Sequence, residues 1–156
     1  NWKGKTVAIE DYAGEAFTLT SREYWNEVKK IIQKRGGKVV LVENEKLMKM
    51  QARMQERYEK TVLEKYRRKE RMLNLERTIF MARSARKANA ELLIMGVAHA
   101  FDVQKIVGKK SNVKIIAHPN KLIRYTYYLC TLNEMKQKQP RRMKQIKQTL
   151  TRWVGG

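Results

Sequence analysis

Four short runs of aliphatic residues limit the folds open to this 156-residue chain. Each run is rich in β-branched or long aliphatic side chains and lacks an alternating polar face, which is typical of strands covered on both sides in a parallel sheet. The runs are Thr6–Glu10, Lys38–Val42, Leu92–Gly96 and Val113–His118. Helical patterns separate them. The sequence therefore predicts an α/β fold with a small, mostly parallel four-stranded sheet and flanking helices.

Two of the helical patterns have recognisable ends. The first covers Ser21–Arg35, with Ser21 as a suitable N-cap and Gly36-Gly37 as the stop. Its apolar stripe consists of Tyr24, Val28, Ile31 and Ile32. The second is the short helix Asp102–Val107, which ends at Gly108. These helices are expected to connect the strands by right-handed crossovers.

The connection over residues 43–89 interrupts this rhythm because it contains neither Gly nor Pro. It fits a single long helix or two helices folded back on each other. Its apolar positions do not form a clean heptad, and pairs such as Glu56/Lys60 support an exposed helical surface. We therefore expect a helical arm at 44–89, with a solvated charged face, inserted into an α/β domain that covers residues 1–135. Such an arm could also bind protein partners, so a scaffold or assembly protein stays open as an alternative.

A basic amphipathic helix is predicted for residues 136–156. Its apolar edge consists of Met143, Ile146, Leu150 and Trp153. The cations expected to contact phosphate are Lys136, Lys138, Arg141, Arg142, Lys144, Lys147 and Arg152. The alternative is a terminal helix whose apolar edge packs on the core, and that helix would still expose its basic side.

The net charge of +20, from 35 Lys and Arg against 15 Asp and Glu, indicates a polyanionic partner. Residues 90–156 hold thirteen basic and three acidic side chains, so half of the excess lies there. Nucleic acid, RNA or DNA, is the favoured partner, and an anionic membrane surface comes second. Zinc-finger, RNA-recognition and KH signatures are absent, so we expect contacts to phosphates in a nucleoprotein assembly rather than readout of bases.

Several other classes are excluded by the composition. The longest apolar runs have four or five residues, far fewer than the 18 or so that a membrane span requires. The single cysteine, Cys130, rules out an internal disulfide and a cysteine-based zinc site, which fits an intracellular, cytoplasmic setting. The sequence contains no GxGxxG or GxxxxGK[ST] motif, so a nucleotide cofactor of those types is not expected.

Polar residues follow the predicted strands at their carboxyl ends, where ligands of parallel sheets gather. They are Glu10, Glu43, His99 and His118. Carboxylate and imidazole groups can hold a divalent metal or transfer protons, so Glu10, His99 and His118 are candidate metal ligands. A metal-assisted hydrolase, and specifically a nuclease, is therefore the enzymatic alternative to simple nucleic-acid binding.

Part of the sequence resembles the TraB/pheromone-shutdown and erythromycin-esterase-like superfamily. The resemblance rests on Leu75-Glu76-Arg77, then Met81-Ala82, then a strand that ends in Gly96-Val-Ala-His99. The earlier strand Val7-Ala-Ile-Glu10 is similar to the acidic strand of that family. The resemblance implies an α/β fold, hydrolase-like or metal-dependent chemistry in some members, and a polar, candidate catalytic cluster of Glu10, Glu76, Arg77 and His99.

Overall fold

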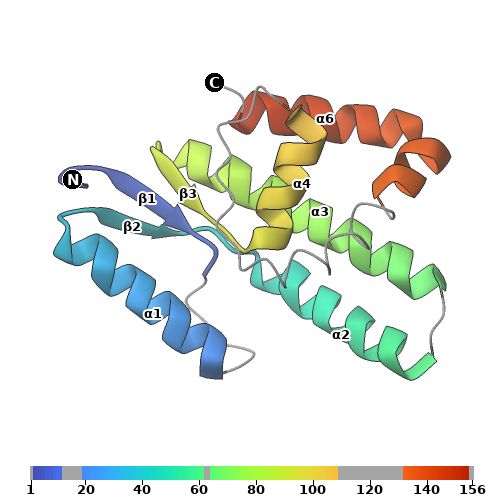
Figure 1. Ribbon diagram of the computed structural model, residues 1–156, viewed down its shortest axis with the longest axis horizontal. Helices are drawn as coiled ribbons and strands as arrows, with labels where there is room; N and C mark the ends of the chain where they lie inside the picture. Colours follow the sequence, from blue (N-terminus) through green and yellow to red (C-terminus); the bar gives the residue numbers. More distant parts are fainter. Residues whose placement is uncertain (1, 12–18, 62–63, 109–131, 155–156) are drawn as a thin grey trace.

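A computed structural model describes residues 2–11, 19–61, 64–108 and 132–154. The strands are β1 (Thr6–Ile9), β2 (Lys38–Leu41) and β3 (Leu92–Ile94). The helices are α1 (Leu19–Lys34), α2 (Glu45–Thr61), α3 (Glu64–Lys87), α4 (Val97–Val107) and α6 (Pro140–Val154). Residues 132–138 are also helical. Figure 1 shows this arrangement of helices around a small sheet.

The sheet is parallel and has the strand order β2-β1-β3. Thr6 pairs with Lys38, and Val7 pairs with Leu92, so β1 is the central strand. This confirms the α/β class and the parallel sheet. Within the described residues the sheet has three strands rather than the predicted four, and the expected fourth strand, 113–118, lies outside those residues.

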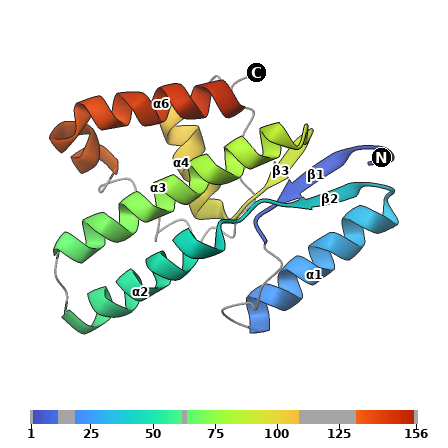
Figure 2. The ribbon, with the colours of Figure 1, turned by 180° about the vertical axis from the view of Figure 1, so that it is seen from behind.

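Helices cover both faces of the sheet, and the alternation along β1 decides which residue faces which helix. Val7 and Ile9 face α1, where they form a buried cluster with Ile32. Ala8 faces the other way, against Met81 of α3. The β1 core is fully buried, at 0–1% exposure for Val7, Ala8 and Ile9. Figure 2 shows α1 and α3 on opposite sides of the strands.

The apolar stripe predicted for α1 is only partly buried. Ile32 and Val28 lie in the cluster under the sheet, joined there by Trp25. Tyr24 and Ile31 are exposed, because their positions rotate away from the strands. Residue Gly36 ends the helix with a φ of 77°, a left-handed conformation that glycine adopts without strain.

The segment predicted as an inserted arm forms an antiparallel hairpin of α2 and α3 (Figure 1). Asn44 caps α2, since its side-chain oxygen accepts a hydrogen bond from Leu47 N at 3.0 Å. The expected arm with a solvated charged face does not extend over the second half of α3. There Met81 and Ala85 pack on the sheet, because small and flexible side chains allow the helix to approach the strands closely.

A third hydrophobic cluster joins α3, α4, the helical residues 132–138 and α6. Its members from α6 are Met143, Ile146 and Leu150, and Trp153 packs against it. The apolar edge predicted for the C-terminal helix is therefore buried, with Leu150 at 0% exposure. Within the described ranges, none of the helices combines the length and apolarity that crossing a membrane demands.

Candidate functional site

Two of the candidate catalytic residues, Arg77 and His99, converge on the carboxylate of a third, Glu10. Glu10 follows β1, Arg77 comes from α3, and His99 lies in the first turn of α4. Arg77 Nη2 donates to Glu10 Oε1 at 3.1 Å, and His99 Nε2 lies 3.5 Å from the same oxygen. Gly96 N donates to Glu10 Oε2. The carboxylate thus joins the central strand to α3 and to α4.

Gly96 permits this approach because it has no side chain. A Cβ at this position would lie 3.0 Å from Glu10 Oε2, a tighter contact than real Cβ atoms normally make. Any larger residue would push the Glu10 carboxylate away by a few tenths of an ångström, so glycine favours the hydrogen bond from the backbone N–H. The predicted Gly96-Val-Ala-His99 motif is explained by this geometry, since its first residue and its last both contact Glu10.

The environment of Glu10 favours its charged form. Burial raises the pKa of the Glu10 carboxyl, but the charge and hydrogen bond of His99, the Gly96 N–H and the charge of Arg77 together outweigh burial. The net result is a pKa below the ordinary value of 4.5. Glu10 is therefore a carboxylate at neutral pH, and it serves as an anionic anchor rather than a proton donor.

Arg77 extends the ion pairs from β1 to β2. Its Nε lies 3.2 Å from both carboxylate oxygens of Glu43, its Nη2 donates to Glu43, and its Nη1 donates to Gln51 Oε1 at 2.7 Å. Burial lowers the pKa of Arg77, but hydrogen bonds and charge from Glu43, with Glu10 and Glu70 adding charge, raise it overall. One guanidinium therefore holds together the ends of two adjacent strands and α2.

The polar contacts continue between α2, α3 and α4. Gln51 Nε2 donates to Glu70 Oε1 at 2.6 Å, and Asn74 Nδ2 donates to Asp102 Oδ2 at 3.0 Å. Arg71 forms a bidentate pair with Asp102, with 2.6 Å between Nη1 and Oδ2. We call the whole set the buried network: Glu10, Glu43, Gln51, Glu70, Arg71, Asn74, Arg77, Thr78, His99 and Asp102.

His99 is fixed by both ring nitrogens. Its Nδ1 lies 2.7 Å from Thr78 Oγ1, and that hydroxyl is also 2.8 Å from the carbonyl oxygen of Asn74. Since a threonine hydroxyl has one proton, donation to the Asn74 carbonyl leaves it to accept a hydrogen bond from Nδ1. The ring thereby has a defined orientation toward Glu10, and only 4% of its side chain is exposed.

The two remaining candidate residues, Glu76 and His118, are not part of this cluster in the described residues. Glu76 does not join Glu10, Arg77 and His99, since it lies at the surface and pairs with Arg142 at 3.0 Å. His118, a candidate metal ligand, lies outside the described residues. Across the described ranges, no group of three or more His, Cys, Asp or Glu is arranged to hold a metal ion.

The second candidate site is the outer side of α6. All seven cations predicted to contact phosphate are exposed. Lys138 pairs with Glu134 and Arg142 pairs with Glu76, both at the surface. We call the cations of the helix itself the α6 basic face: Arg141, Arg142, Lys144, Lys147 and Arg152.

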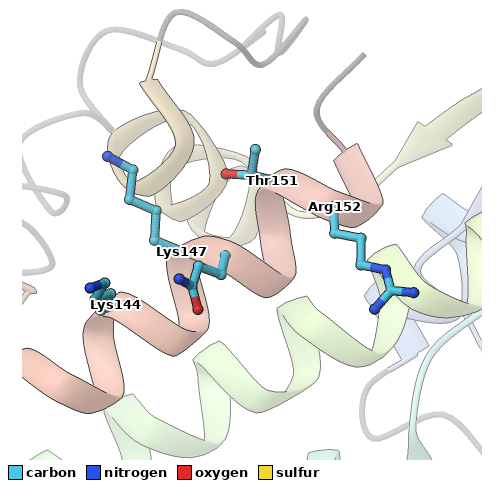
Figure 3. Close-up of a pocket in the computed structure, with 5 residues that line it drawn as sticks. Lys144, Lys147, Thr151 and Arg152 are labelled. Atoms are coloured by element: carbon cyan, nitrogen blue, oxygen red, sulfur yellow. The ribbon is translucent and has the colours of Figure 1, made fainter.

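A shallow depression of about 590 Å³ lies along this face. All of its lining residues come from consecutive turns of α6: Lys144, Lys147, Gln148, Thr151 and Arg152. Figure 3 shows these side chains and labels all of them except Gln148. These positions share one side of α6, opposite the buried edge of Met143, Ile146 and Leu150. The depression therefore presents cations and polar groups to solvent along the helix axis.

Trp153 of α6 contacts α3 through the guanidinium of Arg83 and also lies near its own neighbour Arg152. Arg83 of α3 lies 5.8 Å and Arg152 lies 5.7 Å from the centroid of the tryptophan ring. Both distances are within the range of a cation–π contact. The ring of Trp153 is thus shared by cations from two different helices.

Sequence reasoning missed much of the buried network. The pair of Arg71 and Asp102, together with Asn74 and Thr78, carried no motif. A usable signal was the polar spacing on α3, because Arg71, Asn74 and Thr78 recur every three to four residues and so share one side of that helix. In the comparisons with known proteins, neither a family model, nor a curated protein, nor a solved structure matches the chain.

Proposed function

We propose that this protein binds nucleic acid through phosphate contacts made by the α6 basic face. The observation that carries the proposal is the two-sided character of α6. Its apolar edge is buried in the core, which fixes the helix rotation and directs Lys144, Lys147 and Arg152 outward. Cations held on a rigid element can contact a regular array of phosphates without ordering a flexible tail first.

Charge balance supports the same proposal. The chain has a net charge of +20, and α6 itself contains no acidic residue. Contacts of lysine and arginine with phosphates release counterions, and this release supplies most of the affinity of sequence-independent binding. We therefore propose recognition of the backbone rather than of base sequence, as a component of a nucleoprotein assembly.

The test compares two variants that lose the same number of charges. One carries Lys144→Gln, Lys147→Gln and Arg152→Gln on the α6 basic face. The matched control carries Lys46→Gln, Arg53→Gln and Lys69→Gln, three exposed cations of the α2–α3 hairpin. Binding to a fluorescent mixed-sequence duplex is measured by anisotropy over a series of salt concentrations.

The two variants are expected to differ in the slope of log Kobs against log[salt]. Each lost duplex phosphate contact reduces the slope by about 0.9, so the α6 variant should lose up to about 2.7. The hairpin control should lose much less, because its charges act only through the general field. Equal slopes for both variants would refute the α6 basic face as the binding surface.

A second candidate function is supported by the convergence of Glu10, Arg77 and His99. We propose it as metal-assisted hydrolysis at the carboxyl edge of the sheet, in line with the resemblance of the Gly96–His99 strand end. The assay is hydrolysis of an activated phosphodiester with Mg²⁺, Mn²⁺ or Zn²⁺ added, for the unaltered chain, Glu10→Gln and His99→Asn. Hydrolysis that both variants retain would exclude this cluster, and far-UV circular dichroism would confirm that they are folded.

A further inference from the structure

We propose that the amino edge of the sheet is a second phosphate-binding surface, which contacts the same nucleic acid as the α6 basic face. This inference rests on the proposed function. It adds a site and a ligand class: an extended nucleic acid that spans both surfaces. We call the new surface the amino-edge cluster, and its exposed cations are Lys3, Lys5, Lys34, Arg35 and Lys38.

Backbone hydrogen bonds bring the amino-edge cluster together from two segments. Gly4 N donates to Gly36 O at 3.1 Å, and Lys38 N donates to Lys5 O at 2.8 Å. The segment before β1 is thus held against the turn between α1 and β2. The cations gather because of the fold, although they are about thirty positions apart in the sequence.

A depression of about 550 Å³ opens within this cluster, lined by Lys3, Lys34, Arg35 and Gly36. Gly36 keeps the floor of the depression close to the chain before β1, since a Cβ there would lie 3.2 Å from the Cα of Lys3. Arg35 is positioned by Trp2, with 5.4 Å between its guanidinium carbon and the ring centroid. The depression is therefore lined by three cations from two segments of the chain, which can face one anion together.

A series of contacts connects this cluster to the α6 basic face. Arg152 and Arg83 share the ring of Trp153, which links α6 to the end of α3. Helix α3 then ends with two further exposed cations, Arg86 and Lys87. The chain continues through Glu91, whose N–H donates to Thr6 O at 2.9 Å beside the amino-edge cluster.

The figures agree with this path. In Figures 1 and 2 both α6 and α3 run toward the side of the molecule where the strands begin, and α6 ends near the middle of the long axis. The carboxylates Glu10 and Glu43 lie at the opposite edge of the sheet, where the strands end. Glu91 is an exposed acidic residue among these cations, but the net charge of the exposed residues along the path is strongly positive. A phosphate backbone is the polyanion whose regular spacing suits such a band.

The proposal predicts a dependence on ligand length. Helix α6 has 15 residues and is about 22 Å long at 1.5 Å per residue. A hairpin DNA with a stem of about 6 base pairs covers roughly 20 Å, whereas a duplex of about 24 base pairs covers roughly 80 Å at 3.4 Å per pair. Only the long probe is expected to engage both surfaces at once.

The experiment uses a variant with Lys3→Gln, Lys34→Gln and Lys38→Gln. Arg35 is left in place because it packs on Trp2, and a second variant with only Lys34→Gln and Lys38→Gln guards against a structural effect at Lys3. The control is the variant described above with Lys46→Gln, Arg53→Gln and Lys69→Gln in the α2–α3 helical hairpin. Anisotropy with both DNA probes is measured as a function of salt, and thermal melting followed by circular dichroism checks that each variant is folded.

We expect the amino-edge variant to bind the long duplex at least about tenfold more weakly at 0.1 M salt, with a salt slope reduced by up to about 2.7. Its affinity for the short probe should change less than twofold, because the α6 basic face still binds it. An amino-edge variant that behaves like the hairpin control, while the α6 variant is weakened, would overturn this inference and leave the proposed function standing.

Two further outcomes have distinct meanings. If neither the α6 variant nor the amino-edge variant binds more weakly than the control, the proposed function fails, and this inference fails with it. Vesicles of phosphatidylcholine with phosphatidylserine provide the competing class of polyanion. Vesicle binding that depends on Lys34 and Lys38, with no loss of long-duplex binding in the same variant, would assign the surface to a membrane and overturn the proposal.

Discussion

Removal of the charge on Asp102 is expected to destabilise the protein more than any surface substitution. The perturbation is Asp102→Asn, which keeps the shape of the side chain and removes its charge. Asp102 is 0% exposed and its partner Arg71 is 1% exposed. The variant would leave the guanidinium of Arg71 buried without this carboxylate, beside an amide that cannot accept two charged hydrogen bonds.

The magnitude follows from the geometry of the pair. Two unit charges about 4 Å apart at an effective dielectric constant of about 20 interact by about 4 kcal/mol. Breaking a buried pair by removing one partner costs about 3–5 kcal/mol in measured cases, because an uncompensated charge remains inside. We therefore expect Asp102→Asn to lower the free energy of unfolding by about 3–5 kcal/mol, which corresponds to a fall in Tm of roughly 6–20 °C for a chain of this size.

Urea unfolding followed by circular dichroism gives the free energy, provided that the m-value is unchanged. The control is Glu27→Gln, which breaks the exposed pair with Lys30 and should cost less than about 0.5 kcal/mol. The double variant Arg71→Met with Asp102→Leu should recover much of the loss, since apolar residues of similar volume can replace a buried pair. A loss below about 1 kcal/mol for Asp102→Asn would refute the view that this pair is a structural centre.

Three further predictions concern other parts of the fold. Glu10→Gln should lower the free energy of unfolding by about 1–3 kcal/mol at pH 7. Because folding lowers the pKa of Glu10, the stabilisation by its carboxylate is present above pH 4.5 and disappears as the pH falls through the folded pKa. The unfolding free energies of variant and parent, measured by urea titration, should therefore converge in acid. Gly96→Ala should cost about 1–3 kcal/mol through its contact with Glu10, and clearly less in a Glu10→Ala background, as a double-mutant cycle would measure. Leu150→Ala should cost about 2–5 kcal/mol by thermal melting, since α6 belongs to the core, and an unchanged Tm would contradict that placement.

The sequence predicted the parallel sheet because its strands are continuous aliphatic runs that only a doubly covered sheet can bury. It also predicted which side chains share the carboxyl edge, since parallel strands end at the same edge. Glu10 and His99 meet there, and Glu43 joins them through Arg77. The edge could be predicted because it follows from chain direction alone.

The positions of neighbouring residues on α3 could not be predicted in the same way. Glu76 and Arg77 are adjacent in the sequence, but successive residues of a helix point about 100° apart. Arg77 therefore reaches the strand ends, and Glu76 turns to α6 and pairs with Arg142. The pairing of Arg71 with Asp102 depends on how α3 packs against α4, across 31 residues of sequence, and no local pattern encodes it.

The buried network also bears on the charge of the surface. It contains four carboxylates and two guanidiniums, a formal net of −2 when histidines are left out of the count, so on the same count the remainder of the +20 chain carries +22. Carboxylates that are paired in the interior with Arg71, Arg77 and backbone groups cannot neutralise the cations on the surface. The two features are therefore linked: the internal ion pairs that join strand ends to helices also leave the proposed phosphate-binding surfaces with few competing carboxylates. Long-range repulsion among the cations opposes the compact state. A polyanion that binds the proposed phosphate-binding surfaces should therefore also stabilise the folded protein.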